Sequence, residues 1–292
     1  KALWIVHYQV PKEKDWRSVD ARAVVRAMIG KEVPFEIISG GPWTGGLALV
    51  ADRYRSDRIF LAGDAAHLFT PLGGFGMNTG IGDVMNLGWK LAALSAGWGG
   101  GRLLDSYESE RRPMALRNTS LGILVARKMS AWRLPPDIEA EGDAAEAARL
   151  AFGEFCVKDD AVQYNTSGLQ LGERYEGSPI ISDDGTKAPP DDWHHYVPLD
   201  RPGARAPHFW LSDKRSCFDA LGEGFTLLAF GAAEGIEAFE RAARARGLPL
   251  SVVRAAAADG QPYRSKLVLI RPDQHIAWHG DGAPPDALAI ID

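Results

Sequence analysis

Between Gly63 and Asn78 the chain places a carboxylate next to residues that open the backbone to a ligand. Asp64 follows an apolar run over 59–62, which predicts a strand buried on both faces and ending at Gly63. A carboxylate just past such a strand can accept hydrogen bonds from ligand hydroxyls, because α/β sheets bind ligands in the crevice at their strand ends.

The residues after Asp64 predict a ligand-binding loop and then a helix. Pro71 is rigid, and a group of glycines lets backbone approach a ligand without intervening Cβ atoms: Gly73, Gly74 and Gly76. Asn78 or Thr79 is the expected N-cap of the helix. Apolar residues at helical spacing predict that this helix is amphipathic: Ile81, Val84, Met85, Leu87, Leu91 and Leu94. Its N-terminus would offer free N–H groups and partial positive charge to the ligand.

The order of these residues resembles the second flavin-binding motif of the FAD-dependent aromatic hydroxylases. These are the class A flavoprotein monooxygenases related to para-hydroxybenzoate hydroxylase and phenol hydroxylase. The resemblance implies FAD as cofactor, with Gly63 and Asp64 at its ribityl chain. It also implies that Pro71 lies beside flavin and substrate. The loop and helix start would face the isoalloxazine ring, which gives the remaining candidate cofactor-binding residues: Gly73, Gly74, Gly76, Met77 and Asn78.

In this family NADPH or NADH reduces FAD, and one oxygen atom of O₂ is transferred to an electron-rich aromatic ring. The resemblance therefore predicts an NAD(P)H-dependent monooxygenase acting on a small phenolic or polyketide aromatic. Candidate substrate-binding residues are Trp43, Leu47, Pro71 and Leu72. We assign no catalytic side chain, because the cofactor carries the difficult chemistry.

Other polar residues receive structural interpretations. His67 is interpreted as structural, and Asp83 as a solvated or interdomain charge rather than a catalytic base. Residues 107–113 resemble the Y-E-x-E-R-R-P signature that follows the flavin motif, and we interpret their charges as helix-surface and interdomain pairs. Pro113 is expected to kink the helix predicted over 103–133 or to start a new one. The histidines match no metal-ligand spacing, so we expect no metal site.

A second folded unit is predicted from residue 169 onward. A strand over 225–230, a helix over 233–246, a strand over 251–255 and a hairpin at Pro272 and Asp273 follow in thioredoxin-like order. The strings P-G-x-R-A-P-H, G-F-T-L-L and I-R-P-D-x-x-I-A-W resemble the C-terminal domain of the phenol and anthracycline hydroxylases. Cys156 and Cys217 form no dithiol motif, so we expect a packing or dimer-forming role rather than redox chemistry.

The predicted fold class is therefore α/β, with the C-terminal part of a para-hydroxybenzoate hydroxylase-like FAD/NAD(P)-binding domain followed by a thioredoxin-like domain. We expect the end of the substrate-binding β-sheet region at 1–50 and the second half of the FAD-binding domain with its following helices at 51–133. A linker at 134–168, built around a helix over 144–155, would lead to the thioredoxin-like domain at 169–292. Strands over 3–10, 35–38 and 43–50 and a helix over 18–28 are expected near the start.

Charge and composition exclude some other classes. The net charge of −5 offers no broad basic field for nucleic acid, and no apolar run is long enough to cross a bilayer. Two isolated cysteines among 292 residues fit a reducing, cytoplasmic location.

Two family motifs, a G-x-G-x-x-G after a strand and a mid-chain Asp-Gly, do not precede the flavin motif here. We therefore expect the chain to be a C-terminal portion of a longer enzyme, partnered by the N-terminal remainder of the same enzyme or by a second copy in a homodimer. Two alternatives stay open. One is a non-catalytic dimerisation fragment, and the other is a different flavin enzyme on the same scaffold, a halogenase or an epoxidase.

Overall fold

The computed structural model describes residues 3–11, 13–42, 48–257, 259 and 262–291. The chain divides into two units, Lys1–Gly45 and Gly46–Asp292.

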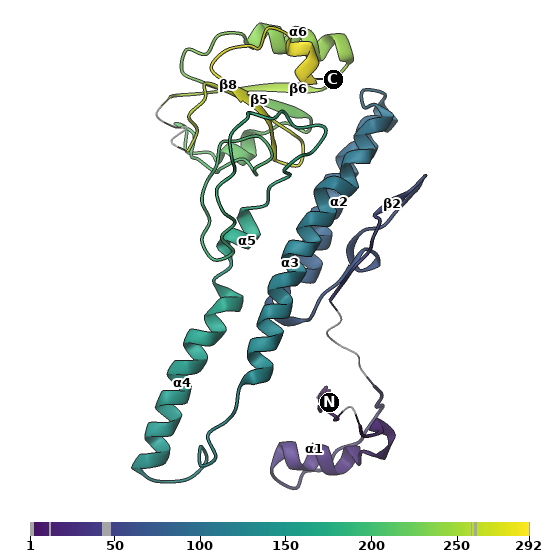
Figure 1. The fold of residues 1–292 in the computed structure, drawn as a ribbon, viewed down its shortest axis with the longest axis vertical. Coiled ribbons are helices and arrows are strands. Elements are labelled where there is room, and N and C mark those ends of the chain that lie inside the picture. The colour runs from purple at the N-terminus through teal and green to yellow at the C-terminus, as the bar shows by residue number, and fades with distance from the viewer. Residues whose placement is uncertain (1–2, 12, 43–47, 258, 260–261, 292) are drawn as a thin grey trace. The chain divides into compact units, whose positions relative to one another are not determined.

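The first unit contains a 3-10 turn at Trp16–Ser18 and, after it, the α-helix α1, Ala21–Ile29 (Figure 1). The Asp20 carboxylate caps α1 by accepting hydrogen bonds from the N–H groups of Arg22 and Ala23, at 2.9 and 3.0 Å. The predicted helix is thus confirmed. The strands predicted over 3–10 and 35–38 are wrong, since the described residues of both ranges are irregular. Apolar alternation alone is insufficient there, because an extended segment needs a neighbouring strand to pair its backbone groups.

Short antiparallel pairs open the second unit. Strand β1, Leu49–Val50, pairs with β4, His67–Leu68. Strand β2, Arg55–Ser56, pairs with β3, Ile59–Phe60. The prediction of a strand over 59–62 buried on both faces is wrong, because β3 has one partner and leaves Ile59 68% exposed.

Two long helices follow, α2 (Phe75–Ala96) and α3 (Ser106–Ala131), joined through a 3-10 turn at Gly101–Asp105. They pack side by side (Figure 1). Pro113 lies inside α3 and starts no new helix, which corrects that part of the prediction. Proline removes one backbone hydrogen bond. Buried residues before and after it, including Arg111 and Met114, hold the helix against its neighbours.

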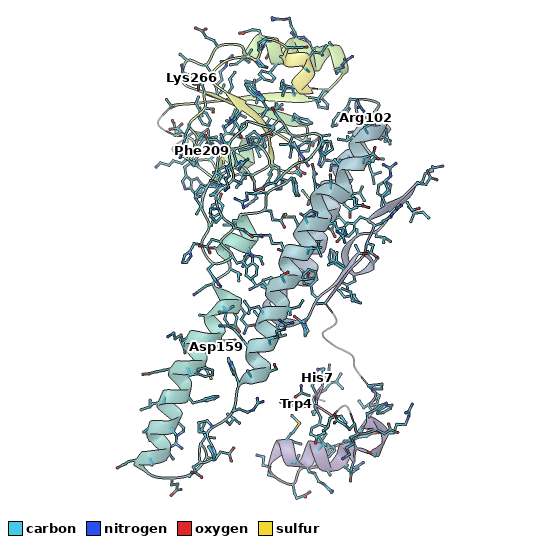
Figure 2. All side chains as sticks on the ribbon, viewed as in Figure 1. Trp4, His7, Arg102, Asp159, Phe209 and Lys266 are labelled. Carbon is cyan, nitrogen blue, oxygen red and sulfur yellow. The ribbon has the colours of Figure 1, made fainter. Side chains whose placement is uncertain are left out.

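Helix α4, Asp143–Tyr164, packs against α3, and the short α5, Ser167–Leu171, follows. Figure 2 labels Asp159 on α4. Its side chain accepts hydrogen bonds from Lys128 Nζ at 3.1 Å and Trp132 Nε1 at 2.6 Å. The predicted helix over 144–155 is confirmed, although it continues for nine residues beyond the predicted end.

A four-stranded sheet dominates the C-terminal part, with strand order β6-β5-β7-β8. Strand β5 is parallel to β6, while the β5–β7 and β7–β8 pairs are antiparallel. The sheet and its crossover helix have these bounds: β5 Phe225–Phe230, α6 Ile236–Arg246, β6 Leu250–Ala255, β7 Leu267–Ile270 and β8 Ile276–Gly280. The predicted succession of strand, helix, strand and hairpin is confirmed, and the turn of the hairpin contains Pro272 and Asp273.

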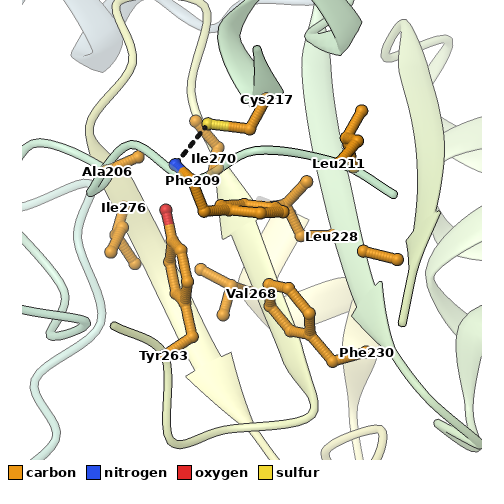
Figure 3. Packing of buried hydrophobic residues seen from close by; sticks show 11 residues of the cluster. Ala206, Phe209, Leu211, Cys217, Leu228, Phe230, Tyr263, Val268, Ile270 and Ile276 are labelled. Atoms are coloured by element: carbon orange, nitrogen blue, oxygen red, sulfur yellow. Dashed lines mark hydrogen bonds between the residues drawn. The ribbon is translucent and has the colours of Figure 1, made fainter. Parts of the chain in front are cut away.

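Apolar side chains cover both faces of this sheet. Figure 3 shows one face, where Phe209, Phe230 and Tyr263 pack over the strands and the Phe209 N–H donates to Cys217 Sγ at 3.3 Å. The other face is covered by α6 and by α7, Ala287–Ile291. Burial raises the pKa of the Cys217 thiol, which therefore stays protonated and unreactive near neutral pH. The 3-10 turn Cys217–Ala220 completes the elements of this part.

Candidate functional site

The turn that carries Asp64 is a 3-10 turn, Gly63–Ala65, pressed against α2. A Cβ atom on Gly80 of α2 would lie only 3.1 Å from the Cα of Gly63. Gly63 has φ +57°, a left-handed conformation that suits glycine. The Asp64 side chain is exposed, and among the described residues its carboxylate has no hydrogen-bond or ion-pair partner. It is therefore free to accept hydrogen bonds from a ligand.

Helix α2 begins in the glycine cluster. A 3-10 turn at Leu72–Gly74 leads into it, with Gly73 at φ +77° and Gly74 at φ +70°. A Cβ atom on Gly73 would lie 2.3 Å from the Phe75 ring, so only glycine fits there. Gly74 is the N-cap and supplies no side-chain acceptor, so no side chain caps the first-turn N–H groups.

The prediction that Asn78 or Thr79 caps this helix is wrong, because the helix starts at Phe75. Both side chains instead bond backward to backbone carbonyls. Asn78 Nδ2 donates to Gly74 O, and Thr79 Oγ1 donates to Phe75 O, each at 2.8 Å. Because Gly73 and Gly74 adopt left-handed conformations, the helix begins about one turn before the residues that were predicted to cap it.

The candidate cofactor residues lie on this turn and on the α2 N-terminus. The exposed ones are Asp64, Pro71, Gly74, Met77 and Asn78, and the partly buried ones are Gly63, Gly73 and Gly76. Leu72 packs against the buried cluster around Phe75. Thr70 Oγ1 donates to Gly122 O at 3.2 Å and ties the residue before Pro71 to α3. The other two candidate substrate residues, Trp43 and Leu47, lie outside the described residues.

Behind the turn lies Asp83, which is fully buried rather than solvated as predicted. One carboxylate oxygen, Oδ2, accepts hydrogen bonds from the Gly63 N–H at 3.1 Å and from His67 Nε2 at 2.6 Å. The other oxygen accepts from Arg111 Nε at 2.9 Å. Burial disfavours the charged form, but the bonds from His67 and Arg111 outweigh it and lower the pKa of Asp83. His67 is itself buried.

Glu110 and Arg111 of the Y-E-x-E-R-R-P segment are also buried, which corrects the interpretation of these two as helix-surface charges. Both pair with residues that follow α5 in the chain, within the same unit of the structure. Arg111 Nη1 donates to Glu173 Oε2 at 2.9 Å and to the Tyr175 hydroxyl at 3.1 Å. Glu110 accepts hydrogen bonds from Nη1 and Nη2 of Arg271, at 2.6 and 2.9 Å. Arg271 lies in the turn between β7 and β8.

Glu110 is the centre of a buried ionic cluster between α2, α3 and the β7–β8 turn. Lys90 Nζ donates to it at 2.7 Å, and Asp273 accepts from Arg271 at 2.6 Å, so two cations face two anions. Burial opposes ionisation of Glu110, yet Arg271 and Lys90 hold its pKa at about 2. Burial lowers the pKa of Lys90 to about 8, with Glu110 partly opposing the shift.

Sequence reasoning missed this network, although one signal was present. Asp83, Asn86 and Lys90 recur at spacings of three and four residues, with Leu87 between them, and all four are buried against the same side of α2. A polar stripe inside an otherwise apolar helix predicts either a solvated face or a paired buried one. The hydrogen-bond partners that decide between these two possibilities lie from 16 to 187 positions away in the sequence.

Within the described ranges, no group of three or more histidine, cysteine, aspartate or glutamate side chains is arranged to hold a metal ion. Among these same residues, no helix has both the length and the apolar character needed to cross a bilayer.

The geometry suits a ligand that carries hydroxyl groups and, a short distance away, electron-rich oxygen or nitrogen atoms. Asp64 can bind hydroxyls, since an ionised carboxylate only accepts hydrogen bonds. The uncapped first turn of α2 can donate N–H groups to the electron-rich end, helped by the helix dipole. Gly73 and Gly74 keep side chains away from that end. The ribityl chain and isoalloxazine ring of a flavin have this pattern, and the turn therefore fits them.

Two families match the chain. Residues 7–121 match the FAD binding domain family, and residues 200–290 match the family described as aromatic-ring hydroxylase, C-terminal.

Curated relatives and solved structures agree with these matches. The FAD-dependent monooxygenase opdD of Penicillium oxalicum is 37% identical over 99% of this chain and 59% of its own length. The 4-methyl-5-nitrocatechol 5-monooxygenase of a Burkholderia species is 37% identical over 92% of this chain and 48% of its own. The rebeccamycin biosynthetic enzyme RebC with reduced flavin superposes with a TM-score of 0.83 at 38% identity, covering 94% of this chain and 52% of RebC. The chain thus spans about half the length of the relatives it matches.

Proposed function

Because this chain belongs to the FAD-dependent aromatic-ring hydroxylases, we propose that it contributes the ribityl and isoalloxazine side of an FAD site in an NAD(P)H-dependent monooxygenase. The substrate class is a phenolic or polyketide aromatic, which agrees with the named activity of the nitrocatechol monooxygenase relative. The observation that carries the proposal is the exposed Asp64 carboxylate, which has no partner in the part of the chain that the structure describes, beside the uncapped N-terminus of α2.

Each part of the turn has a task in this proposal. Asp64 accepts hydrogen bonds from the ribityl hydroxyls and so fixes the position of the flavin. The N–H groups of Gly76, Met77 and Asn78 face its pyrimidine edge, where the helix dipole offsets negative charge. When bound, FAD accepts hydride from NAD(P)H and supplies the oxygen-transfer chemistry.

Pro71 and Leu72 form the wall between cofactor and substrate in this proposal. Pro71 is exposed at the mouth of the turn, and Leu72 is anchored from behind by Phe75 and Leu121. A rigid proline and an apolar side chain exclude water from the reacting atoms, which protects reactive species from hydrolysis. Trp43 and Leu47 remain proposed substrate contacts.

The exposed side of α2 supports a further part of the proposal. It carries apolar side chains that are 40–75% exposed: Met77, Ile81, Val84, Met85, Leu91 and Leu94. Such a face is normally covered in a stable protein. We propose that this face packs against a further flavin-binding segment of the kind that the longer relatives possess, and not against a second copy of this chain.

The domain boundaries at 51–133, 134–168 and 169–292 also belong to this proposal. A thioredoxin-like assignment for the last of them is supported by the strand order β6-β5-β7-β8, in which only the first pair is parallel. A cytoplasmic location is supported by two unpaired cysteines, Cys156 and Cys217.

The experiment is purification of the protein that carries this chain, followed by three measurements. Visible absorption should show the bands of bound oxidised flavin. NAD(P)H and O₂ consumption should rise when phenols or polyketide aromatics are added, and mass spectrometry should show products that have gained one oxygen atom. Absence of flavin together with no NAD(P)H consumption would refute the proposal, and a halogenated or epoxidised product would favour the alternative flavin chemistry.

A further inference from the structure

We propose that Arg111 and Glu173 are positioning residues for the flavin-binding turn, so that the C-terminal part of the chain controls cofactor affinity without contacting the cofactor. This inference rests on the proposed FAD site. It assigns a role in cofactor binding to buried charges that lie behind the site.

The first step is the link from Asp64 to Asp83. Gly63 precedes Asp64 and adopts a left-handed conformation, so its peptide orientation sets the direction of the Asp64 side chain. Its N–H donates to Asp83 Oδ2 at 3.1 Å. The same oxygen accepts from His67 Nε2 at 2.6 Å, just after the turn. Asp83 therefore holds the turn at both of its ends.

The second step is the link from Asp83 to Arg111. Arg111 is fully buried and reaches α2 through two of its nitrogens. Nε donates to Asp83 Oδ1 at 2.9 Å, and Nη2 donates to Thr79 O at 3.1 Å. A planar guanidinium bound at two points has little freedom, so it fixes the position of the Asp83 carboxylate.

The third step leaves the flavin-binding part of the chain. Arg111 Nη1 donates to Glu173 at 2.9 Å and to the Tyr175 hydroxyl at 3.1 Å. Both acceptors follow α5, more than 60 residues along the chain from Arg111. Without Glu173 the buried guanidinium would lose its second carboxylate, and Asp83 would be left to balance the charge alone.

A second branch secures Tyr175 itself. Its ring stacks on His275 with centroids 4.0 Å apart, and Arg271 lies over it at 5.3 Å. Both partners belong to the turn between β7 and β8, where Arg271 is bound by Glu110. The chain of contacts therefore runs from the C-terminal sheet to Gly63 with buried groups at nearly every point, and displacement at one end is transmitted to the other.

The test compares Glu173→Gln, Glu173→Asp and a matched control in the protein that carries the full chain. Glu173 is suitable because its side chain is 19% exposed, so the amide variant can still be hydrated. The control is Asp191→Asn. Asp191 accepts from Arg117 Nε at 2.7 Å and thus forms the same kind of pair between α3 and the segment after α5, away from Asp83.

We expect Glu173→Gln to raise the FAD dissociation constant about 5- to 20-fold and to alter the visible circular dichroism of the flavin at saturating FAD. Glu173→Asp keeps the negative charge, so its FAD affinity and its visible circular dichroism should lie between those of the wild type and Glu173→Gln. Asp191→Asn should lower the melting temperature to a similar degree but leave the affinity and the spectrum unchanged.

Equal FAD affinity and equal flavin spectra in wild type and Glu173→Gln would overturn the inference. The same holds if Asp191→Asn weakens FAD binding as much as Glu173→Gln, since both would then act through general stability. Failure of the wild type to bind FAD is a different result, because it would refute the proposed function itself.

Discussion

Glu110 lies at the centre of a buried cluster of charges. It is fully buried and accepts hydrogen bonds from Lys90, Arg271, Asn86 and the Ser178 hydroxyl. Several kcal/mol of desolvation penalty per ion are offset only because each charge has a close opposite partner. Removing one member therefore leaves the others uncompensated.

This arrangement predicts a specific acid sensitivity. The pKa of Glu110 is lowered from about 4.5 to about 2, so its stabilising contribution is fully present above pH 4.5 and is lost as the pH falls through 2. The loss in unfolding free energy should be of the order of 3 kcal/mol. Glu110→Gln should be destabilised by about 3 kcal/mol at neutral pH and should show a flatter dependence between pH 5 and 2.

Urea denaturation at several pH values checks this prediction. Glu146→Gln is a suitable control, because Glu146 forms an exposed ion pair with Arg149 within α4. If Glu110→Gln and Glu146→Gln lost the same small amount of stability, the buried cluster would contribute nothing beyond a surface pair.

Residue types alone indicated the ligand side of the site. Asp64, Pro71 and the glycines lie close together in the sequence, and their chemistry is local, so a motif can describe them. The roles of Asp83 and Glu110 could not be derived in the same way. A charge on a helix is normally solvated, and their buried state depends on Arg111 and Arg271, which only the tertiary fold brings near.

At the scale of elements, the decisive feature is which side of α2 is buried. Helical spacing correctly predicted the helix, and the apolar stripe of an amphipathic helix normally faces the core. In the structure Leu87 alone of the apolar set is buried, while Asp83 and Lys90 face α3. Periodicity identifies a helix and its stripes, whereas the partner element determines which stripe is covered.

Close packing of α2 on the Gly63 turn gives a prediction for Gly80→Ala. The added Cβ would lie 3.1 Å from Gly63 Cα, so the turn must move by a few tenths of an ångström. Alanine normally stabilises a helix interior relative to glycine by about 0.5–1 kcal/mol. We expect no such gain at Gly80, together with weaker FAD binding.

The control for this variant is Gly153→Ala in α4, where an added Cβ meets no atom within 4 Å. Thermal unfolding should show the ordinary stabilisation at this position, with FAD affinity unchanged. A comparable gain in stability for both variants would show that the contact between α2 and the turn is looser than the structure indicates.

At the scale of the whole molecule, the chain combines two functions in one set of contacts. Its earlier part carries Asp64 and the α2 N-terminus, for which we propose a cofactor-binding function. Its last part packs a sheet whose β7–β8 turn enters the ionic cluster around Glu110. The C-terminal sheet was predictable in detail, because its strands are short apolar runs separated by clear turn residues. The strands expected over 3–10 and 35–38 are absent from the described residues of those ranges, because a strand exists only with a partner. Of the strand expected over 43–50, residues 43–47 lie outside the described residues, and Leu49–Val50 form β1.

The central claim is that Asp64 binds FAD, and its direct test is the FAD dissociation constant of Asp64→Ala. Asp57→Asn serves as the control, since Asp57 is also exposed and its left-handed φ of +51° is tolerated by asparagine. Fluorescence titration of the apoprotein should show binding weakened by about 10- to 100-fold in Asp64→Ala, the loss expected for hydrogen bonds to a charged group. Asp57→Asn should bind like the wild type. Equal affinity in Asp64→Ala and the wild type would contradict the account.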